Sequence, residues 1–296
     1  MSTTRVRLAN RRLLVRGLLL GAATCWAAAA QAQRGRGRGS PAGQTADCGA
    51  VNRNGRAYGG GEPVIRNIPY DGRFTFVRLT YVPGPGGYYY QREPSWAHGY
   101  WENYPEEAEI NLMEIMREVS IFHPHVLQTN AIAMDDPELF KYPVAYMTEA
   151  GYWEITNRET LALRKYLLKG GFLIIDDSRA DYNRGKNGWA TLTNDVTRLF
   201  PALHPVKLDN THPIFHSFFD FDKPLACVPQ GYDLVPPEFY GVFQDNDPKK
   251  RMYMMINFNT DISDFWEFSA NGFYPVGQAN DAYKLGVDYL MYALTH

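Results

Sequence analysis

The feature that most constrains the fold is the run at 172–176, in which four large apolar residues precede Asp176. A strand that is apolar on both faces is typical of a parallel sheet covered by helices on each side. The preceding residues predict a helix, because Thr156 and Glu159 form a capping box ahead of an apolar stripe. Gly170-Gly171 can end that helix, since glycine readily adopts the left-handed conformation. Helix, tight turn and buried strand together indicate an α/β fold.

The rest of the chain continues this alternation of strands and helices. We expect further strands at 74–81, 125–129, 143–148 and 252–258, and helices from Glu106, at 189–200 and at 281–294. The pattern predicts one α/β domain with a doubly wound, mostly parallel sheet flanked by helices. We assign this domain to residues 67–296.

The N-terminus reads as an export signal over residues 1–32. Basic residues without an acidic one precede an apolar run, and Ala30-Gln31-Ala32 offers a cleavage site before Gln33. The apolar run is shorter than the roughly 20 residues that a membrane-spanning helix needs, so we expect cleavage and no permanent membrane anchor. The predicted location is periplasmic or secreted. Arg11-Arg12 matches part of a twin-arginine signal, which leaves two export routes open.

Residues 33–66 are predicted to be a disordered linker rich in Gly and Arg. From Asn67 onward the chain has 19 Lys and Arg against 30 Asp and Glu, a balance of 19 − 30 = −11. Such an acidic domain is not expected to bind nucleic acid. Cys48 and Cys227 remain after the signal is removed, and an oxidising compartment allows them to pair or to stay free.

Polar and aromatic residues follow three of the predicted strands. Ligands of open α/β sheets bind at the carboxyl ends of the strands, so these segments are expected to meet there. Glu149, Asp176 and Asp177 are the candidate catalytic residues. The candidate ligand-binding residues are Trp96, His98, Trp101, Tyr152, Trp153, Ser178 and Arg179. Aromatic rings beside carboxylates are typical of a carbohydrate site.

Each candidate also has a purely structural interpretation. An aspartate after a buried strand is often a helix N-cap or a turn residue, which applies to Asp176 and Asp177. The aromatic loop after Tyr81 is either part of the site or a lid over the core. His212 and His216 have the spacing of helical metal ligands, but Pro213 favours a turn there, so neither a metal nor a cofactor is expected.

Four segments carry a family resemblance: the strand at 76–81, Tyr142-Pro143, the stretch at 163–173 and His212-Pro213-Ile214-Phe215. Together they resemble the DUF4159 family of exported or membrane-associated bacterial domains. The resemblance implies a fold similar to class I glutamine amidotransferases and ThuA-like proteins, and thus flavodoxin-like. Those amidotransferases place a cysteine nucleophile after the strand that we identify with 172–176. Here Asp176-Asp177-Ser178 stands at that turn, so glutaminase activity is not expected.

Two functions remain open from the sequence. The first is an exported binding domain for a small polar ligand, such as a sugar, or for a protein partner in the envelope. The alternative is a carbohydrate-active hydrolase or isomerase that uses Asp176, Asp177 and Glu149. No complete nucleophile and base pair is present in the sequence, which favours binding and leaves catalysis open.

Overall fold

The computed structural model describes residues 50–51, 57–58, 67–81, 107–179, 181–182, 186–223, 225, 228 and 236–296. The chain divides into two compact units, residues 1–64 with 270–272, and residues 65–269 with 273–296. Within the first unit, β1 (Ala50–Val51) pairs antiparallel with β2 (Ala57–Tyr58). The predicted signal peptide, most of the predicted linker and both Cys48 and Cys227 lie outside the described residues.

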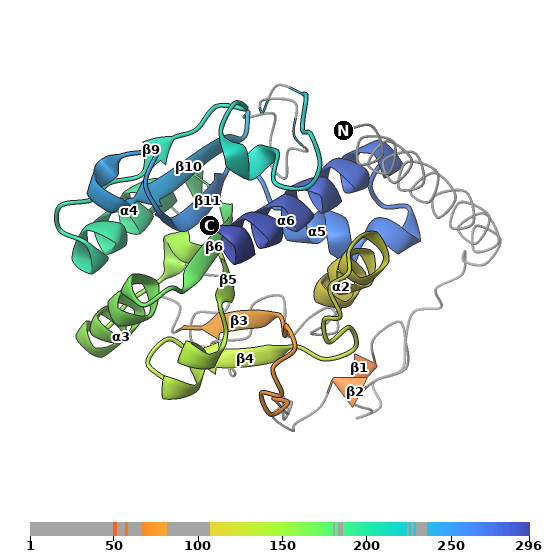
Figure 1. Ribbon diagram of the computed structural model, residues 1–296, viewed down its shortest axis with the longest axis horizontal. Coiled ribbons are helices and arrows are strands. Elements are labelled where there is room, and N and C mark those ends of the chain that lie inside the picture. Colours follow the sequence, from red (N-terminus) through yellow and green to blue (C-terminus); the bar gives the residue numbers. More distant parts are fainter. Residues whose placement is uncertain are drawn as a thin grey trace, which may run out of the picture. The chain divides into compact units, whose positions relative to one another are not determined.

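The larger unit is built on a seven-stranded sheet. Its strands lie in the order β4 (Asn130–Ala133), β3 (Val77–Thr80), β5 (Val144–Thr148), β6 (Phe172–Ser178), β11 (Met252–Phe258), β10 (Glu238–Phe243) and β9 (Val206–Lys207) (Figure 1). The pairings from β4 to β11 are parallel, whereas β10 pairs antiparallel with both β11 and β9. This arrangement confirms the predicted α/β class with a mostly parallel sheet.

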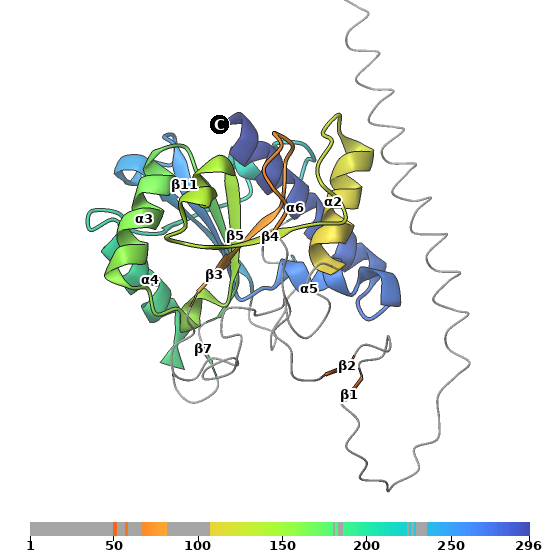
Figure 2. The same cartoon turned by 90° about the horizontal axis from the view of Figure 1, so that it is seen from below.

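Helices cover both faces of the sheet (Figure 2). On one face lie α2 (Glu107–Val119), α5 (Ile262–Glu267) and α6 (Val276–Thr295), and on the other lie α3 (Asn157–Leu168) and α4 (Gly188–Leu199). Short 3-10 turns connect them at Pro137–Lys141, Ala150–Tyr152, Pro213–Phe215, Gln244–Asn246 and Ser269–Asn271. A small antiparallel ribbon, β7 (Asp181–Tyr182) with β8 (Lys186–Asn187), precedes α4.

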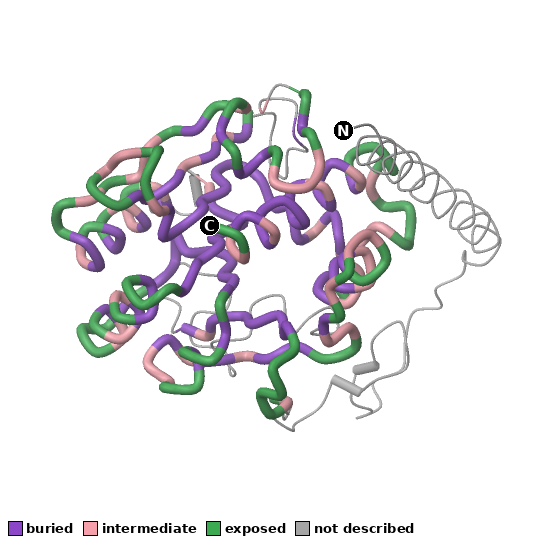
Figure 3. Tube along the Cα trace, in the orientation of Figure 1, coloured by how far each residue is buried: buried purple, intermediate pink, exposed green. Residues whose placement is uncertain are grey.

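Strand β6 carries the core on both of its faces, as its apolar run predicts. Phe172 and Ile174 belong to the core beneath α2, α5 and α6, while Leu173 and Ile175 belong to the core beneath α3 and α4. The central strands are buried along their length (Figure 3). The sheet is therefore a rigid support for the residues at its ends.

Helix α3 forms as its sequence predicts. The Thr156 side chain accepts from the Glu159 backbone at 3.2 Å, and the Glu159 carboxylate accepts from the Thr156 backbone at 2.8 Å. Gly170 has a φ of 123°, which confirms the glycine turn at the end of the helix. At Gly171 an added Cβ would lie 2.3 Å from the Tyr166 ring, so the chain can enter β6 only through a residue without a side chain.

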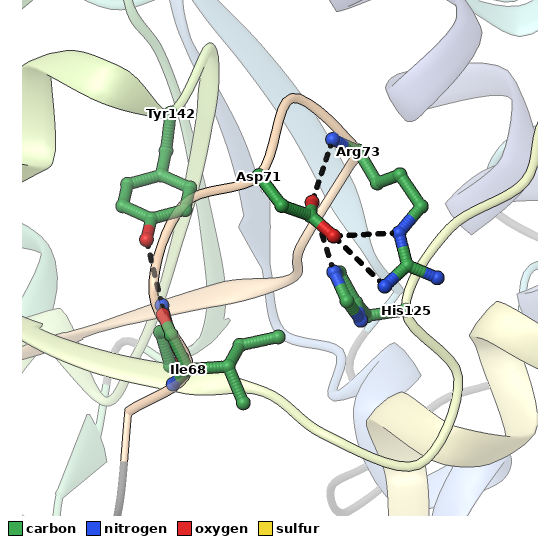
Figure 4. A network of polar contacts seen from close by, with 6 residues as sticks. Ile68, Asp71, Arg73, His125 and Tyr142 are labelled. Atoms are coloured by element: carbon green, nitrogen blue, oxygen red, sulfur yellow. Dashed lines mark hydrogen bonds and ion pairs between the residues drawn. The ribbon is translucent and has the colours of Figure 1, made fainter.

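The strand predicted at 125–129 is wrong, because the strand of this region is β4 at Asn130–Ala133. β4 pairs with β3 from the register Val77–Asn130 onward, so residues 125–129 have no strand beside them. Instead His125 donates its backbone N–H to Phe74, and its ring lies against Asp71 at 3.1 Å (Figure 4). The sequence also did not predict β10 and α5.

The direction in which successive strands are added to the sheet changes between β3 and β5. The chain runs from β3 outward to β4 and then returns to place β5 on the other side of β3. Loops diverge at the carboxyl ends of two such strands, and ligands of open α/β sheets bind at that point. Here the Tyr81 hydroxyl, directly after β3, donates to the carbonyl of Thr148 at the end of β5 at 3.1 Å. None of the helices in the described part of the chain is long and apolar enough to cross a membrane.

Candidate functional site

Three neighbouring strands end in the same unusual way. Glu149 follows β5, Asp177 lies near the end of β6 and Asn259 follows β11, and their φ angles are 52°, 52° and 58°. These residues are adjacent in space, because Thr148 pairs with Asp176 and the Asn259 N–H donates to the Ser178 carbonyl at 2.6 Å. Left-handed backbone at non-glycine residues is costly and concentrates at functional sites.

Asp176 is the centre of a buried hydrogen-bond network below these strand ends. Its carboxylate accepts from the Tyr146 hydroxyl at 2.5 Å, from the Asn257 amide at 2.7 Å and from the Ser263 backbone at 3.1 Å. The Tyr289 hydroxyl extends the network by donating to Asn257 at 2.9 Å. Asp176 thus joins β5, β6, β11 and the first turn of α5, and it does not act as a helix N-cap.

A second acidic group comes from α5, which the sequence did not predict. Asp261 caps this helix, and its carboxylate accepts from the Asp264 backbone at 3.1 Å and from the Ser263 hydroxyl at 2.8 Å. The Tyr274 hydroxyl donates to Asp264 at 3.2 Å. Glu149 and Asp176 were selected because ligands of open α/β sheets bind at the carboxyl ends of strands. The same argument, applied to the polar residues after the predicted strand at 252–258, identifies Asn259 and Asp261.

Burial and repulsion between neighbouring acids raise the pKa values of four carboxyl groups on β6 and α5, as follows. Burial, reinforced by the charge of Asp261, raises the pKa of Asp176 to about 7 and that of Asp264 to about 8. Burial and the charges of Asp261 and Glu149 hold the pKa of Asp177 well above its ordinary value. Burial and the charge of Asp264 raise the pKa of Glu267 to about 9. Shifts of this kind mark a site that can hold protons at neutral pH.

The structure places four of the predicted ligand-binding residues near this edge. Tyr152 and Trp153 follow Glu149 but are buried, Trp153 within the core beneath α3 and α4. Burial and the nearby Glu149 raise the pKa of Tyr152 to about 12. Ser178 is buried, and its hydroxyl has no hydrogen-bond partner among the described residues.

Arg179 supplies positive charge that opposes the rise in the pKa of Asp177. The remaining candidates, Trp96, His98 and Trp101, lie outside the described residues. The elements that follow Asp177 are β7 and β8, so Asp177 is not the N-cap of a helix directly after β6.

No group of three His, Cys, Asp or Glu side chains within the described ranges is arranged to hold a metal ion. His212 and His216 flank the turn Pro213–Phe215, as Pro213 predicts, and the His212 ring accepts from the Ile214 backbone at 3.3 Å. Their four-residue spacing therefore reflects a 3-10 turn rather than one face of a helix.

The fold and the strand ends define a class: an α/β domain with a mostly parallel sheet and a protonatable acidic cluster at its carboxyl edge. The sequence model described as "Domain of unknown function (DUF4159)" matches residues 76–294. The chain therefore belongs to the DUF4159 family. No curated protein matches the chain.

Proposed function

We propose that the chain is an exported domain that binds a small polar, sugar-like ligand at the carboxyl ends of β5, β6 and β11. The observation that carries this proposal is the row of left-handed residues Glu149, Asp177 and Asn259 on three neighbouring strands. Left-handed backbone costs on the order of 1 kcal/mol at a residue such as Glu149 and less at asparagine, and such residues concentrate at functional sites. A row of polar side chains aimed by strained backbone is what a binding site requires.

The chemistry of the acidic cluster suits a hydroxyl-bearing ligand. A protonated carboxyl group donates one hydrogen bond and accepts others, whereas a carboxylate only accepts. Because the pKa of Asp264 is raised to about 8, both forms of its carboxyl group are present near neutral pH. Sugar hydroxyls, which donate and accept at once, match such a mixed set.

The strand order supports a finer assignment of the fold. The five parallel strands, numbered along the chain, lie in the order 2-1-3-4-5, the order of flavodoxin-like sheets. We propose the class I glutamine amidotransferase-like variant of this fold without its cysteine chemistry. In this proposal Asp176-Asp177-Ser178 corresponds to the turn at which those enzymes carry their cysteine nucleophile.

A carbohydrate-active hydrolase or isomerase is the second candidate, and the raised pKa of Asp177 favours it. A general acid must hold a proton at the working pH, which a raised pKa achieves. Release of nitrophenol from a panel of nitrophenyl glycosides, lost in Asp177→Asn, would establish the hydrolase. If the wild-type protein releases no nitrophenol from any glycoside of the panel, the hydrolase is contradicted, and binding and isomerisation remain.

Ligand binding is tested by thermal shift with neutral sugars at pH 7. A sugar that raises Tm in the wild type and not in Asp177→Asn supports the site. Glu118→Gln is the matched control, because Glu118 is an exposed carboxylate on α2. If no sugar raises Tm, the small-ligand proposal fails and a protein partner in the envelope becomes the leading candidate.

Export is tested by expressing the full chain in a bacterial host and sequencing the N-terminus of the periplasmic product. We expect it to begin at Gln33. Replacement of Arg11-Arg12 by Lys-Lys blocks export if the twin-arginine route is used and leaves it intact otherwise. Retention of the whole wild-type chain in the cytoplasm contradicts the proposal.

A further inference from the structure

A cluster of aromatic rings lies on the surface beside the acidic residues of α5. Phe273 is 71% exposed, and its ring packs against Phe268 at 5.5 Å and edge-on against Tyr274 at 4.9 Å between ring centroids. Tyr274 in turn packs on the buried Phe265 at 4.0 Å, which anchors the cluster to the core. Phe268 and Tyr274 are partly buried, so Phe273 is the ring of this cluster that is exposed to solvent. A large exposed apolar side chain backed by other rings can mark a binding site.

Phe273 lies in the short connection between α5 and α6. Gly272 before it has a φ of 71°, a conformation that favours glycine, and Pro275 precedes the first residue of α6. The contacts of the exposed ring connect it to Asp264 through Tyr274.

Two carboxyl groups lie near the Tyr274 hydroxyl. The hydroxyl donates to Asp264 at 3.2 Å, and burial together with the charges of Asp264 and Glu267 raises the pKa of Tyr274. Arg78, whose charge acts on Glu267, is paired with Glu109 in the buried layer between β3 and α2. Aromatic faces and carboxylates both attract a positive charge, the first through the ring quadrupole and the second through Coulomb attraction.

We propose that the aromatic cluster of Phe268, Phe273 and Tyr274, with Asp264 and Glu267, binds a protonated amine carried on a sugar ring. The inference deepens the proposed sugar site and rests on it, since Asp264 lies against Asp261 and the candidate site. The sugar's apolar face stacks on Phe273, and its ammonium group lies at the carboxylates. A neutral sugar stacks on Phe273 but has no ammonium group to pair with the carboxylates.

Binding of an amine also displaces protons. Asp264 and Glu267 hold protons at pH 7, because their pKa values are raised to about 8 and about 9. An arriving ammonium group stabilises the carboxylate, so the carboxyl group releases its proton to the buffer and forms an ion pair, with no other change in charge. The groups that face Asp264 and Glu267 are Asp176, Asp177, Asp261, Tyr274, Arg78 and Glu109.

The experiment is isothermal titration calorimetry of the full chain with D-glucosamine and with D-glucose at pH 7, each in two buffers of different ionisation enthalpy. We expect glucosamine to bind roughly tenfold more tightly, as one charge-assisted contact implies. We also expect glucosamine, and not glucose, to release up to about one proton per carboxyl group engaged. Its affinity should rise with pH from 6 to 7.

Variants locate the site. Phe273→Ala should weaken both sugars, and Asp264→Asn should remove the preference for the amine and the proton release. Glu267→Gln is a second charge-neutral variant in case Asp264→Asn does not fold. Ile121→Ala is the control, because Ile121 is an exposed residue, 88% accessible, between α2 and β4. It should bind both sugars as the wild type does.

Each failure has a separate meaning. If glucose binds and glucosamine binds no more tightly or releases no proton, this inference is overturned and the proposed sugar site stands. If Phe273→Ala and the charge-neutral variants keep wild-type affinities, the amine binds elsewhere and the inference is likewise overturned. If neither sugar binds, both proposals are overturned.

Discussion

Asp177 combines a left-handed backbone with a buried carboxyl group that is surrounded by other acids. Either condition alone destabilises the folded chain, and residues of this kind persist where a function depends on them. The carboxylate of Asp176, the residue before it, accepts from three hydrogen-bond donors on β5, β11 and α5. Two adjacent aspartates therefore differ in backbone: Asp177 is left-handed at the strand end, whereas Asp176 continues the strand below it.

Asp177→Asn is expected to stabilise the protein. Asparagine tolerates the left-handed conformation, and the amide removes the repulsion from Asp261 and Glu149. Because the pKa of Asp177 is raised in the folded state, the wild type loses stability as pH rises, so the gain should be larger at pH 8 than at pH 5. We expect Tm to rise by roughly 2–4 °C at pH 8.

The measurement is a pair of thermal melts at the two pH values, with Glu118→Gln as an exposed control whose Tm stays unchanged. A loss of stability in Asp177→Asn at pH 8 would show that the carboxylate makes an essential contact instead.

At the scale of elements, the network around Asp176 joins parts of the chain that are far apart in sequence. It links β5 through Tyr146, β11 through Asn257 and α5 through Ser263. The six residues of α5 are too few to form a stable helix alone, so tertiary contacts must stabilise it. The Asp261 cap and the Asp176 carboxylate provide those contacts at its first turn.

Asp176→Ala should destabilise the protein by about 3 kcal/mol or more, because three buried donors lose their acceptor. Tyr146→Phe, which removes one hydrogen bond of the same network, should cost about 1 kcal/mol. Urea denaturation at pH 6 measures both. Equal losses for the two variants would mean that the network does not centre on Asp176.

Two glycines of α6 provide a matched pair. An added Cβ at Gly286 would lie 2.6 Å from the Trp266 ring and 3.0 Å from Leu112, whereas nothing lies within 4 Å at Gly277. Gly286→Ala should therefore cost about 1–3 kcal/mol by forcing α6 away from α2 and α5. Gly277→Ala should stabilise the helix by up to about 1 kcal/mol. Chemical denaturation of both variants tests whether α6 packs as closely as the structure shows.

For the larger unit as a whole, carboxyl groups with raised pKa values dominate the dependence of stability on pH. Burial raises the pKa of Asp176 and of Asp288 on α6 to about 7, that of Asp264 to about 8 and that of Glu267 to about 9. Each is protonated more readily in the folded than in the unfolded chain. The stability that these groups contribute is present below about pH 4 and is lost as pH rises through these values.

Tm should therefore fall steadily between pH 5 and pH 9. Below about pH 4 the trend should reverse, since Asp209 and Glu238 have lowered pKa values through bonds with Thr211 and Lys207 and lose them on protonation. Melting curves in one-unit steps of pH at constant ionic strength test this profile. A Tm that rises from pH 7 to pH 9 would contradict the protonated state of the acidic cluster.

The sequence predicted much of the fold because local chemistry decides it. The capping box at Thr156, the glycines at 170–171 and the apolar run of β6 each have one favourable local structure. The sequence did not predict the positions of β4 and α5, because contacts with distant residues rather than local patterns define them. β4 is defined by its register with Val77 and α5 by its contacts with Asp176, and neither has a strong local pattern.

By itself the sequence determined the α/β class and the positions of Glu149, Asp176 and Asp177 after buried strands, because periodicity and strand polarity are local properties. Only the tertiary structure decided how these acids differ. Register places Glu149, Asp177 and Asn259 side by side, and α5 brings Asp261 and Asp264 to the same edge. The pKa of a carboxyl group depends on burial and on charges from distant parts of the chain, so the chemistry of the site arises only when these segments meet.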